Sequence, residues 1–357
     1  MKVRKILFIN RRLSVGGAER VMTLLANATA KRGIETDMVV LQDMERTYQV
    51  DEKVNIIQFK HEKYNPIIKA FKRIMDLRHI MRKGKYDAVV VFMHVDGFYT
   101  IISQGFKKEN LIISERNDPR RFKQLYVKIG RKLLYPLALK FVFQTEDAMN
   151  CFPENIRKKS YVISNPINEN LPEPYTGERD KEVIAIGRLV SQKNFPMAIN
   201  AFEKFYNKNP EYKFTIYGDG PLRESLEKTI KEKELENVIN LPGFSKNIIE
   251  DIKKAGIYIS SSDFEGISNA MLEAMAMGIP TVCTDCPIGG AKMTIKNNEN
   301  GVLVPVGDED ALYRAMDKVA NDSTFAKEIS ENAIKIREEL SIDKILDKWI
   351  DVMERWY

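Results

Sequence analysis

The segment Glu265–Glu273, EGISNAMLE, places two carboxylates eight positions apart across the junction between a loop and a helix. The apolar run Ala255–Ser260 precedes it and predicts a strand. Gly278-Ile279-Pro280 follows and indicates a helix stop before another strand. This order predicts an open α/β sheet, in which acidic side chains at the carboxyl end of a strand lie where such sheets bind ligands.

Two basic residues extend this candidate site. Arg188 and Lys193 follow the predicted strand Val183–Gly187, and we expect them at the same edge of the sheet. A guanidinium and an ammonium suit phosphate oxygens, whereas carboxylates accept hydrogen bonds from the hydroxyls of a ribose or a hexose. The basic pair alone could be a solvated loop. Together with Glu265 and Glu273, it predicts a sugar-nucleotide site.

The length of the chain and its repeated pattern predict two domains. At about 100–200 residues per domain, 357 residues are too many for one core. Strand and helix patterns alternate in both halves, which predicts doubly wound, Rossmann-like parallel sheets. The expected strands are 5–10, 37–41, 54–59, 88–93, 111–114 and 141–143 in the first half, and 183–187, 214–217, 238–241, 257–260, 281–284 and 302–304 in the second.

A polar stretch, Asn168–Asp180, has the composition of a linker. We therefore expect one domain at 1–167 and a second at 168–340, facing each other across a cleft. The closing segment 341–357 contains a predicted amphipathic helix, Ser341–Arg355. Phe122–Leu139 is predicted to form one helix of the first domain.

The charge is distributed unequally between the halves. The net charge of the chain is +6, but residues 1–167 carry 32 basic and 17 acidic side chains, a net +15, and the remainder carries −9. This asymmetry predicts an anionic partner for the N-terminal half. No aromatic-basic motif of a nucleic-acid module is present, so we expect no nucleic-acid binding.

The predicted helix at 67–83 contributes to the basic excess. At about 100° per residue, it has one basic and one apolar face. The basic face carries Lys69, Lys72, Arg73, His79 and Lys83, and the apolar face Ile67, Phe71, Ile74, Leu77 and Met81. The basic face is either solvated or meets anionic lipid head groups or a lipid diphosphate. A second basic run strengthens the lipid interpretation: Arg120, Arg121, Lys123, Lys128, Arg131 and Lys132.

Other strand ends carry weaker signals. Gly16-Gly17 precedes a helix and forms either a tight turn or a loop that lets an anion approach. His94 ends one predicted strand of the first half, the Glu115-Arg116 pair follows another, and either could touch an acceptor. We expect no metal, because Asp308-Glu309-Asp310 opens a helix as an N-cap and Cys283/Cys286 lack a second ligand pair.

The ordered set of motifs resembles the family 4 retaining glycosyltransferases, which have the GT-B fold. The matching features are Gly16-Gly17, Gly187-Arg188 with Lys193, Gly218-Asp219-Gly220, the E-x7-E element Glu265…Glu273, Gly278-Ile279-Pro280, Asn300-Gly301 and Pro305. The resemblance spans nearly the whole chain. It is strongest to members that extend lipid-linked oligosaccharides for capsule, O-antigen or glycoprotein glycans, including polymerising N-acetylgalactosamine transferases. Ser114–Pro119 and Gly289-Gly290-Ala291 are also similar in that subgroup.

This resemblance implies catalytic roles for Arg188, Lys193 and Glu265. The two cations would bind the nucleotide diphosphate and offset the charge of the leaving group, and Glu265 would face the donor sugar. Glu273 would accept hydrogen bonds from the ribose. The implied donor-binding residues are Gly16, Gly17, Gly187, Gly218, Phe244, Gly266, Ile267, Ser268, Asn269 and Glu273. Neither a metal nor a cofactor is implied.

The first domain is then expected to bind the acceptor and the second the nucleotide sugar, with the closing helix packing back on the first domain. The acceptor-side candidates are His94, Glu115, Arg116, Lys69, Lys72 and Arg73. Many relatives carry a histidine where this chain has Arg116. Arg116 could instead hold an anionic acceptor or a charged sugar.

The expected reaction moves a hexose or N-acetylhexosamine, with retention, from a UDP-linked donor to a lipid-diphosphate-linked saccharide. The process served would be the synthesis of a cell-surface polysaccharide or glycan. The first apolar run is too short for a signal peptide, and the expected location is cytoplasmic, peripheral at the inner face of the cell membrane.

Two alternatives stay open, a non-hydrolysing sugar-nucleotide 2-epimerase and a non-catalytic GT-B partner subunit. The basic first half counts against the epimerase, and the four site residues count against the subunit.

Overall fold

The computed structural model describes residues 2–14, 16–42, 48–105 and 110–355. The chain forms two compact units. Unit 1 consists of Met1–Pro166 together with Ile342–Tyr357, and unit 2 consists of Ile167–Ser341. Val15 in the predicted glycine loop and the last two residues of the closing segment lie outside the described residues.

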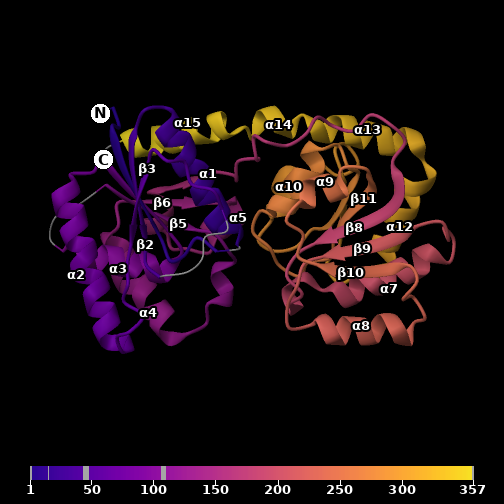
Figure 1. Ribbon diagram of the computed structural model, residues 1–357, viewed down its shortest axis with the longest axis horizontal. Helices are drawn as coiled ribbons and strands as arrows, with labels where there is room; N and C mark the ends of the chain where they lie inside the picture. Colours follow the sequence, from indigo (N-terminus) through magenta and orange to yellow (C-terminus); the bar gives the residue numbers. More distant parts are fainter. Residues whose placement is uncertain (1, 15, 43–47, 106–109, 356–357) are drawn as a thin grey trace. The chain divides into compact units, whose positions relative to one another are not determined.

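Unit 1 contains a seven-stranded parallel sheet with the order β3-β2-β1-β4-β5-β6-β7 (Figure 1). The strands are β1 (Lys5–Asn10), β2 (Glu35–Val40), β3 (Val54–Gln58), β4 (Ala88–Phe92), β5 (Leu111–Glu115), β6 (Lys140–Phe143) and β7 (Ser160–Val162). The central strand β4, with the sequence AVVVF, is apolar and buried along its whole length. Helices on both faces of a parallel sheet require this composition.

The helices of unit 1 are α1 (Gly17–Lys31), α2 (Pro66–Gly84), α3 (His94–Gln104), α4 (Leu125–Leu134), α5 (Glu146–Asn150), α6 (Glu154–Arg157) and α15 (Ile342–Glu354), with short 3-10 turns η1 (Pro119–Arg121) and η2 (Tyr135–Leu137). α1 packs against α15, and α3 packs against both α2 and α4. The end of the chain is fixed in this unit by Trp349, which is fully buried with its ring 6.0 Å from that of Phe92.

Unit 2 contains a six-stranded parallel sheet with the order β10-β9-β8-β11-β12-β13 (Figure 1). Its strands are β8 (Asp180–Ile186), β9 (Lys213–Tyr217), β10 (Ile239–Gly243), β11 (Ala255–Ser260), β12 (Thr281–Thr284) and β13 (Val302–Val304). Val183 and Ala185 of β8 pack into one apolar cluster and Ile184 into another. Alternate residues of a strand point to opposite faces, so a core fills each side of the sheet.

The helices of unit 2 are η3 (Ser191–Lys193), α7 (Phe195–Tyr206), α8 (Arg223–Glu232), α9 (Ile248–Ile252), α10 (Asn269–Ala276), α11 (Gly290–Thr294), α12 (Glu309–Asn321), α13 (Ser323–Ile334) and α14 (Ile336–Glu339). α7 packs on α12, and α10 packs on α13 and α14. No helix among the described residues has the length and apolar content needed to cross a bilayer.

Each sheet has a point where the chain order reverses between neighbouring strands. In unit 1 these neighbours are β1 and β4, and in unit 2 they are β8 and β11. The loops after two such strands lead to opposite sides of the sheet, which makes this position the usual ligand site of open α/β folds. The two switch points therefore define where functional residues are expected.

The prediction of two parallel α/β domains is confirmed, and all twelve predicted strands are present. Three details were wrong. The predicted helix 122–139 is α4 followed by the separate turn η2, because Pro136 cannot continue an α-helix. His94 opens α3 rather than ending a strand, since Met93 turns the chain with a φ of 71°. The short strand β7 was not predicted.

Candidate functional site

The residues of the predicted donor site come from two neighbouring strand ends of unit 2. Arg188 and Lys193 follow β8, and Glu265 follows β11, which is paired with β8. Glu273 lies on α10, the helix that this second loop enters. The structure thus brings Lys193 and Glu265, 72 residues apart in sequence, to the switch point of the sheet.

Lys193 and Glu265 form a direct ion pair. The Lys193 Nζ donates to Glu265 Oε2, and the Ser262 Oγ donates to the same oxygen at 3.1 Å. The two charged side chains are only 15% and 20% exposed, so solvent screens the pair less than a surface salt bridge. Sequence reasoning missed Ser262, because a serine after a strand carries no distinguishing signal.

Further hydrogen bonds tie the two loops together. The Ser261 Oγ donates to the carbonyl oxygen of Lys193 at 2.7 Å. The Asn194 Nδ2 donates to Asp263 Oδ1 at 2.8 Å, and the Asp263 N–H donates to the Gln192 carbonyl at 2.9 Å. Lys193 is therefore held by its backbone, and its ammonium can act as a preorganised positive charge.

Arg188, unlike Lys193, is not paired with a carboxylate of the described chain. Its side chain is exposed, and in the part of the chain that the structure describes this side chain has no hydrogen-bond or ion-pair partner. A guanidinium offers five N–H donors in a fork that matches phosphate oxygens. Arg188 is thus an uncommitted cation at the same sheet edge as the Lys193–Glu265 pair.

Two glycines allow the loops to pack closely at this edge. A Cβ on Gly218, which has a φ of +133°, would lie 2.0 Å from the carbonyl oxygen of Gly187. A Cβ on Gly290 would lie 1.9 Å from the carbonyl oxygen of Gly266. Any side chain at either position would separate the loops, so glycine is required on both sides of the switch point.

The helix α10 carries the second carboxylate of the EGISNAMLE segment. Ser268 caps the helix, its side-chain oxygen accepting from the N–H of Met271 at 3.4 Å. Glu273 is only 6% exposed, although its neighbours Leu272 and Ala274 belong to an apolar core. A buried carboxylate costs free energy unless it is hydrogen-bonded or paired, and Glu273 has a hydrogen-bonding or electrostatic interaction with other residues of the chain.

The other predicted donor residues lie at successive strand ends. Gly187 follows β8, Gly218 follows β9 and Phe244 follows β10, where its ring is 59% exposed. The backbone of Gly266, Ile267 and Ser268 leads into Asn269, the first residue of α10. Phe244 is two strands away from β8, and an extended ligand is required to reach it from Arg188.

In unit 1, Gly16 and Gly17 lie at the N-terminus of α1. The N–H of Gly16 donates to the hydroxyl of Tyr48 at 3.3 Å, and that hydroxyl donates to the Gly16 carbonyl at 3.1 Å. A Cβ on Gly16 would collide with the carboxylate of Glu19, which folds back over the helix end. An anion at this helix end would have to displace the Glu19 carboxylate.

The switch point of unit 1 also holds an ion pair that was not predicted. The Arg11 Nε and Nη2 both donate to Asp96 Oδ1 at 3.2 Å, joining the loop after β1 to α3. Asp96 is almost fully buried, and burial raises the pKa of its carboxyl despite the opposing charge of Arg11. No sequence spacing connects these two residues.

Glu115 and His94 lie in one buried cluster. The Glu115 carboxylate accepts from Arg131 Nη2 at 2.8 Å and from the Tyr135 hydroxyl, and His94 Nδ1 lies 3.7 Å from Glu115 Oε2. Burial acts to raise the pKa of Glu115, but His94, Arg131 and Tyr135 outweigh it and hold the pKa below its ordinary value. The ring of Phe122 packs on His94 with centroids 4.1 Å apart. His94 is therefore positioned, not free to rotate.

Arg116 is a buried cation with no carboxylate partner among the residues that the structure describes. Its guanidinium donates to Asn165 Oδ1 and, at 3.4 Å, to Ser114 Oγ, and it lies over the Phe92 ring at 4.6 Å. Burial lowers its pKa to about 9. Arginine nevertheless stays protonated in proteins, so the group is an uncompensated positive charge at the carboxyl end of β5.

The predicted faces of α2 are partly wrong. Arg73 was expected on the exposed basic face, but it is buried and donates to the carbonyl oxygen of Leu41 at 2.9 Å. Ile67 and Phe71 were expected in the core, but they are 83% and 63% exposed. The buried side of α2 follows the line Arg73, Leu77 and Met81, because the Arg73 guanidinium finds an acceptor in the Leu41 carbonyl and lies 5.9 Å from the ring centre of Tyr99 on α3. Lys69 and Lys72 are partly exposed.

Two motifs that suggested metal or redox chemistry have structural roles. Asp308 caps α12, as predicted, by accepting from the Ala311 N–H at 2.8 Å. Cys283 and Cys286 are buried, and burial raises the pKa of Cys286 to about 11. Within the described ranges, no three His, Cys, Asp or Glu side chains form a cluster that could hold a metal ion.

Comparison with known proteins agrees with this geometry. Residues 15–171 match the family model described as Glycosyltransferase Family 4, and residues 167–336 match the model described as Glycosyl transferases group 1. The chain is 29% identical over 358 residues, 98% of each chain, to a Campylobacter jejuni α-1,4-N-acetyl-D-galactosaminyltransferase named for a diNAcBac-PP-undecaprenol-linked substrate. It is 28% identical, over 90% of this chain and 91% of the relative, to a second Campylobacter jejuni enzyme. That relative is a 4-α-N-acetylgalactosaminyltransferase named for a diphospho-undecaprenol substrate.

Among solved structures, Anabaena HepE in complex with UDP and glucose has a TM-score of 0.83 to this chain at 17% identity, covering 98% of this chain and 99% of that one. Two parallel α/β sheets of this kind define the GT-B fold of glycosyltransferases. The two family matches together extend over most of the chain. The protein belongs to the family 4 glycosyltransferases, and the resemblance inferred from its motifs is confirmed.

Proposed function

We propose that the chain is a retaining, metal-independent glycosyltransferase that moves a hexose or N-acetylhexosamine from a UDP-linked donor to a lipid-diphosphate-linked saccharide. The observation that carries this proposal is the gathering of Arg188, Lys193 and Glu265 at the switch point of unit 2, with the buried carboxylate of Glu273 on the adjoining helix. The UDP complex of Anabaena HepE and the names of the Campylobacter relatives support the choice of donor and acceptor.

The proposed role of Arg188 and Lys193 is electrostatic. As the bond between the sugar C1 and the diphosphate oxygen breaks, negative charge grows on the leaving phosphate. The two cations, of which Lys193 is held in place by Glu265 and Ser261, stabilise that charge more than the ground state, which lowers the barrier. Lys193 then shares its ammonium between the phosphate and Glu265, whereas Arg188 contributes a guanidinium for which no described carboxylate competes.

The carboxylates act in binding in this proposal. Glu265 accepts from hydroxyls of the donor sugar and Glu273 from those of the ribose. The acceptor hydroxyl attacks C1 on the face from which the phosphate departs, and its proton passes to the leaving phosphate oxygen. This proton transfer needs no side chain as a base and no metal ion.

The acceptor half belongs to unit 1. His94, Glu115 and Arg116 lie at the carboxyl ends of β4 and β5, and Arg116 supplies positive charge without a carboxylate partner in the described chain. We propose that α2 contacts the inner face of the cell membrane through Lys69 and Lys72. The exposed Ile67 and Phe71 add apolar surface beside these lysines, a combination typical of interfacial helices.

A transfer assay tests this function. The chain is incubated with UDP-N-acetylhexosamines or UDP-hexoses and an undecaprenyl-diphosphate-linked saccharide, and the anomeric configuration of the product is read by NMR. We expect a new α-linkage from an α-linked donor, in the presence of a chelator. A β-linked product would contradict retention, and epimerised donor without transfer would favour the 2-epimerase.

A further inference from the structure

Ser262 lies in the middle of a short chain of side-chain hydrogen bonds at the switch point of unit 2. Its Oγ donates to Glu265 Oε2 at 3.1 Å, and the Ser260 Oγ lies 3.3 Å from the Ser262 Oγ. A serine hydroxyl has a single proton, and that of Ser262 is used by the carboxylate, so Ser260 is the donor of the second bond. The hydrogen bonds therefore all run toward Glu265.

The Ser262 hydroxyl is enclosed by the protein. Ser262 is 1% exposed, and its carbonyl oxygen accepts from the Thr284 Oγ1 at 2.6 Å. Thr284 is the last residue of β12, the strand that pairs with β11. The backbone of Ser262 is thus fixed to the sheet, and its side chain is a donor that solvent does not reach.

Glu265 is fixed through its backbone and through one carboxylate oxygen. Its N–H donates to the Pro287 carbonyl at 2.8 Å, and its carbonyl accepts from the Ile288 N–H at 3.2 Å. The Oε2 accepts from both Lys193 and Ser262. The Oε1 has no hydrogen-bond partner among the residues that the structure describes, and the side chain is 20% exposed. One carboxylate oxygen is therefore used by the protein, and the other is left for a ligand.

The Lys193 side chain is also confined. A Cβ on Gly187 would lie 2.8 Å from the Lys193 Cε and 3.1 Å from its Cδ, so the lysine stem crosses the space that any larger residue at 187 would fill. One N–H of the ammonium donates to Glu265, and the other two have no partner in the described chain. These two donors are available to a phosphate.

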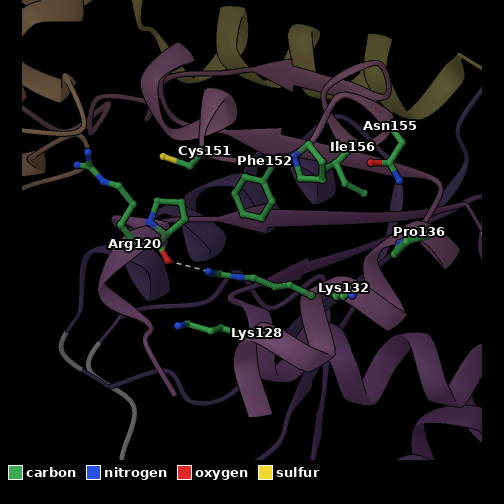
Figure 2. Close-up of a pocket in the computed structure, with 11 residues that line it drawn as sticks. Arg120, Lys128, Lys132, Pro136, Cys151, Phe152, Asn155 and Ile156 are labelled. Atoms are coloured by element: carbon green, nitrogen blue, oxygen red, sulfur yellow. Dashed lines mark hydrogen bonds between the residues drawn. The ribbon is translucent and has the colours of Figure 1, made fainter. Parts of the chain in front are cut away.

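The ion pair between Arg131 and Glu115 in unit 1 differs from this arrangement. Arg131 lines a cavity of about 500 Å³, and its guanidinium donates to the Pro119 carbonyl at 2.7 Å (Figure 2). The Glu115 side chain is 0% exposed, and its Oε1 accepts from both Arg131 and Tyr135. That carboxylate is enclosed on all sides, as in a structural ion pair. The Glu265 carboxylate is instead held at one oxygen and open at the other.

We infer that Ser262 is a positioning residue for glycosyl transfer and that it acts through Glu265. It holds Oε2 beside Lys193 and so leaves Oε1 directed at the donor sugar. It also keeps the carboxylate in place when the ammonium meets the leaving phosphate, because a counter-ion that followed Lys193 would weaken the positive charge there. This inference rests on the proposed function and adds to it a residue that touches neither substrate.

Steady-state kinetics of the full chain test the inference, with UDP release measured for the UDP-N-acetylhexosamines, UDP-hexoses and lipid-linked saccharide of the transfer assay. Ser262→Ala should lower kcat about 10- to 100-fold, the effect of a small misplacement of reacting groups. The donor KM and the affinity for UDP alone should stay within about threefold of the native values, because Arg188 and Lys193 are retained. Ser262→Cys keeps a weaker donor of similar size, and its kcat should lie between those of the native chain and Ser262→Ala.

A double-mutant cycle distinguishes positioning from a purely structural role. In a chain that already carries Glu265→Gln, Ser262→Ala should lower the residual kcat less than about twofold, because the carboxylate that Ser262 positions is gone. Thr215→Val is the matched control. It removes a hydroxyl that donates to the Glu182 carboxylate at 2.6 Å in the same sheet, and it should turn over as the native chain does.

Two results would overturn the inference. The first is a native kcat in both Ser262 variants when circular dichroism shows them folded. The second is a loss of kcat by Ser262→Ala that is equally large with Glu265 and with Glu265→Gln, since the two residues would then act independently.

Failure of the proposed function gives a different result. A native chain that releases no UDP from any donor would refute glycosyl transfer, and the role of Ser262 with it. A native chain that transfers sugar but is indifferent to the Ser262 substitutions would refute the role of Ser262 alone.

Discussion

Lys193 differs from Arg188 in having its charge already partly compensated. Its ammonium binds Glu265 Oε2, which also accepts from Ser262, whereas Arg188 is exposed with no partner in the described chain. A diphosphate arriving at this edge would find one cation held by Glu265 and one whose donors are not used by the described residues. Both cations could then offset the charge of the diphosphate.

Removal of either Lys193 or Glu273 should abolish most turnover. We expect Lys193→Ala and Glu273→Gln each to lower kcat/KM by about 10²–10³, the usual effect of deleting one preorganised electrostatic contact. Donor turnover and the melting curve are measured together. Lys204→Ala, a surface lysine of α7 paired with Glu309, serves as control and should turn over normally. Native rates in both site variants would refute the site assignment.

The buried Glu115 should make the unfolding free energy depend on pH. Its pKa is held below the ordinary value, so its contribution is complete above the ordinary carboxyl pKa of about 4.3 and is lost as the pH falls through the lowered pKa. Glu115→Gln leaves Arg131 without its carboxylate and should cost about 3–5 kcal/mol of unfolding free energy at neutral pH. The loss of unfolding free energy caused by Glu115→Gln should become smaller as the pH falls.

Denaturant unfolding across this pH range measures the effect. Glu154→Gln is the control, because its carboxylate is 69% exposed in a surface pair with Lys158 and should change little. A Glu115→Gln variant as stable as the native chain at neutral pH would show that the cluster does not depend on the charge.

At the residue level, the sequence predicts well where strand ends carry charged side chains. Arg188, Lys193 and Glu265 were located in this way, because parallel strands end at a common edge. Ser262 and the Arg11–Asp96 pair were not, since contacts between distant loops leave no periodic signal. The restraint of Gly16 by Tyr48 was also beyond prediction for the same reason.

At the level of elements, α2 shows where periodicity fails. The helix pattern identifies an apolar stripe but not which part of that stripe the neighbouring helix covers. In unit 1 the covered line includes Arg73, whose guanidinium donates to the Leu41 carbonyl, while Ile67 and Phe71 are exposed. Strands were predicted more accurately, because a buried parallel strand is apolar on both faces.

Removing a positive charge from α2 should have a different effect at its exposed lysines than at the buried Arg73. Lys69→Gln with Lys72→Gln should weaken binding to anionic vesicles about 30-fold at low salt, without loss of stability. Arg73→Gln should instead lower the unfolding free energy by about 1–3 kcal/mol, because it leaves a buried carbonyl unsatisfied. Co-sedimentation and chemical denaturation of both variants measure this contrast. If Arg73→Gln instead weakened vesicle binding and left stability unchanged, while the lysine variant lost stability, Arg73 would belong to the exposed face as first predicted.

At the level of the molecule, the end of the chain completes the first unit. Ile342–Tyr357 belongs to unit 1, and the Lys140 Nζ and the Asn110 Nδ2 donate to carbonyls of α15 at 2.6 and 2.8 Å. The fold class follows from the alternating strand and helix patterns, but the return of the end of the chain to unit 1 was implied only by the family resemblance. The apolar pattern of a helix does not identify the domain core against which that helix packs.

Trp349→Ala tests how unit 1 depends on α15. Removing a fully buried indole should lower the unfolding free energy of unit 1 by about 3–5 kcal/mol. Hydrogen exchange read by mass spectrometry should show faster exchange in peptides of β4 and α15, with those of unit 2 unchanged. Phe205→Ala, in the core of unit 2, is the matched control and should give the converse pattern. Equal effects of Trp349→Ala in both units would contradict this division.

The central claim is that the switch point of unit 2 binds a nucleotide diphosphate through Arg188 and Lys193. Calorimetric titration of UDP into the full chain tests it most directly. The account predicts saturable binding in the native chain and at least a tenfold loss of affinity in Arg188→Ala with Lys193→Ala, with folding preserved. UDP binding of equal strength in the native chain and this variant would contradict it.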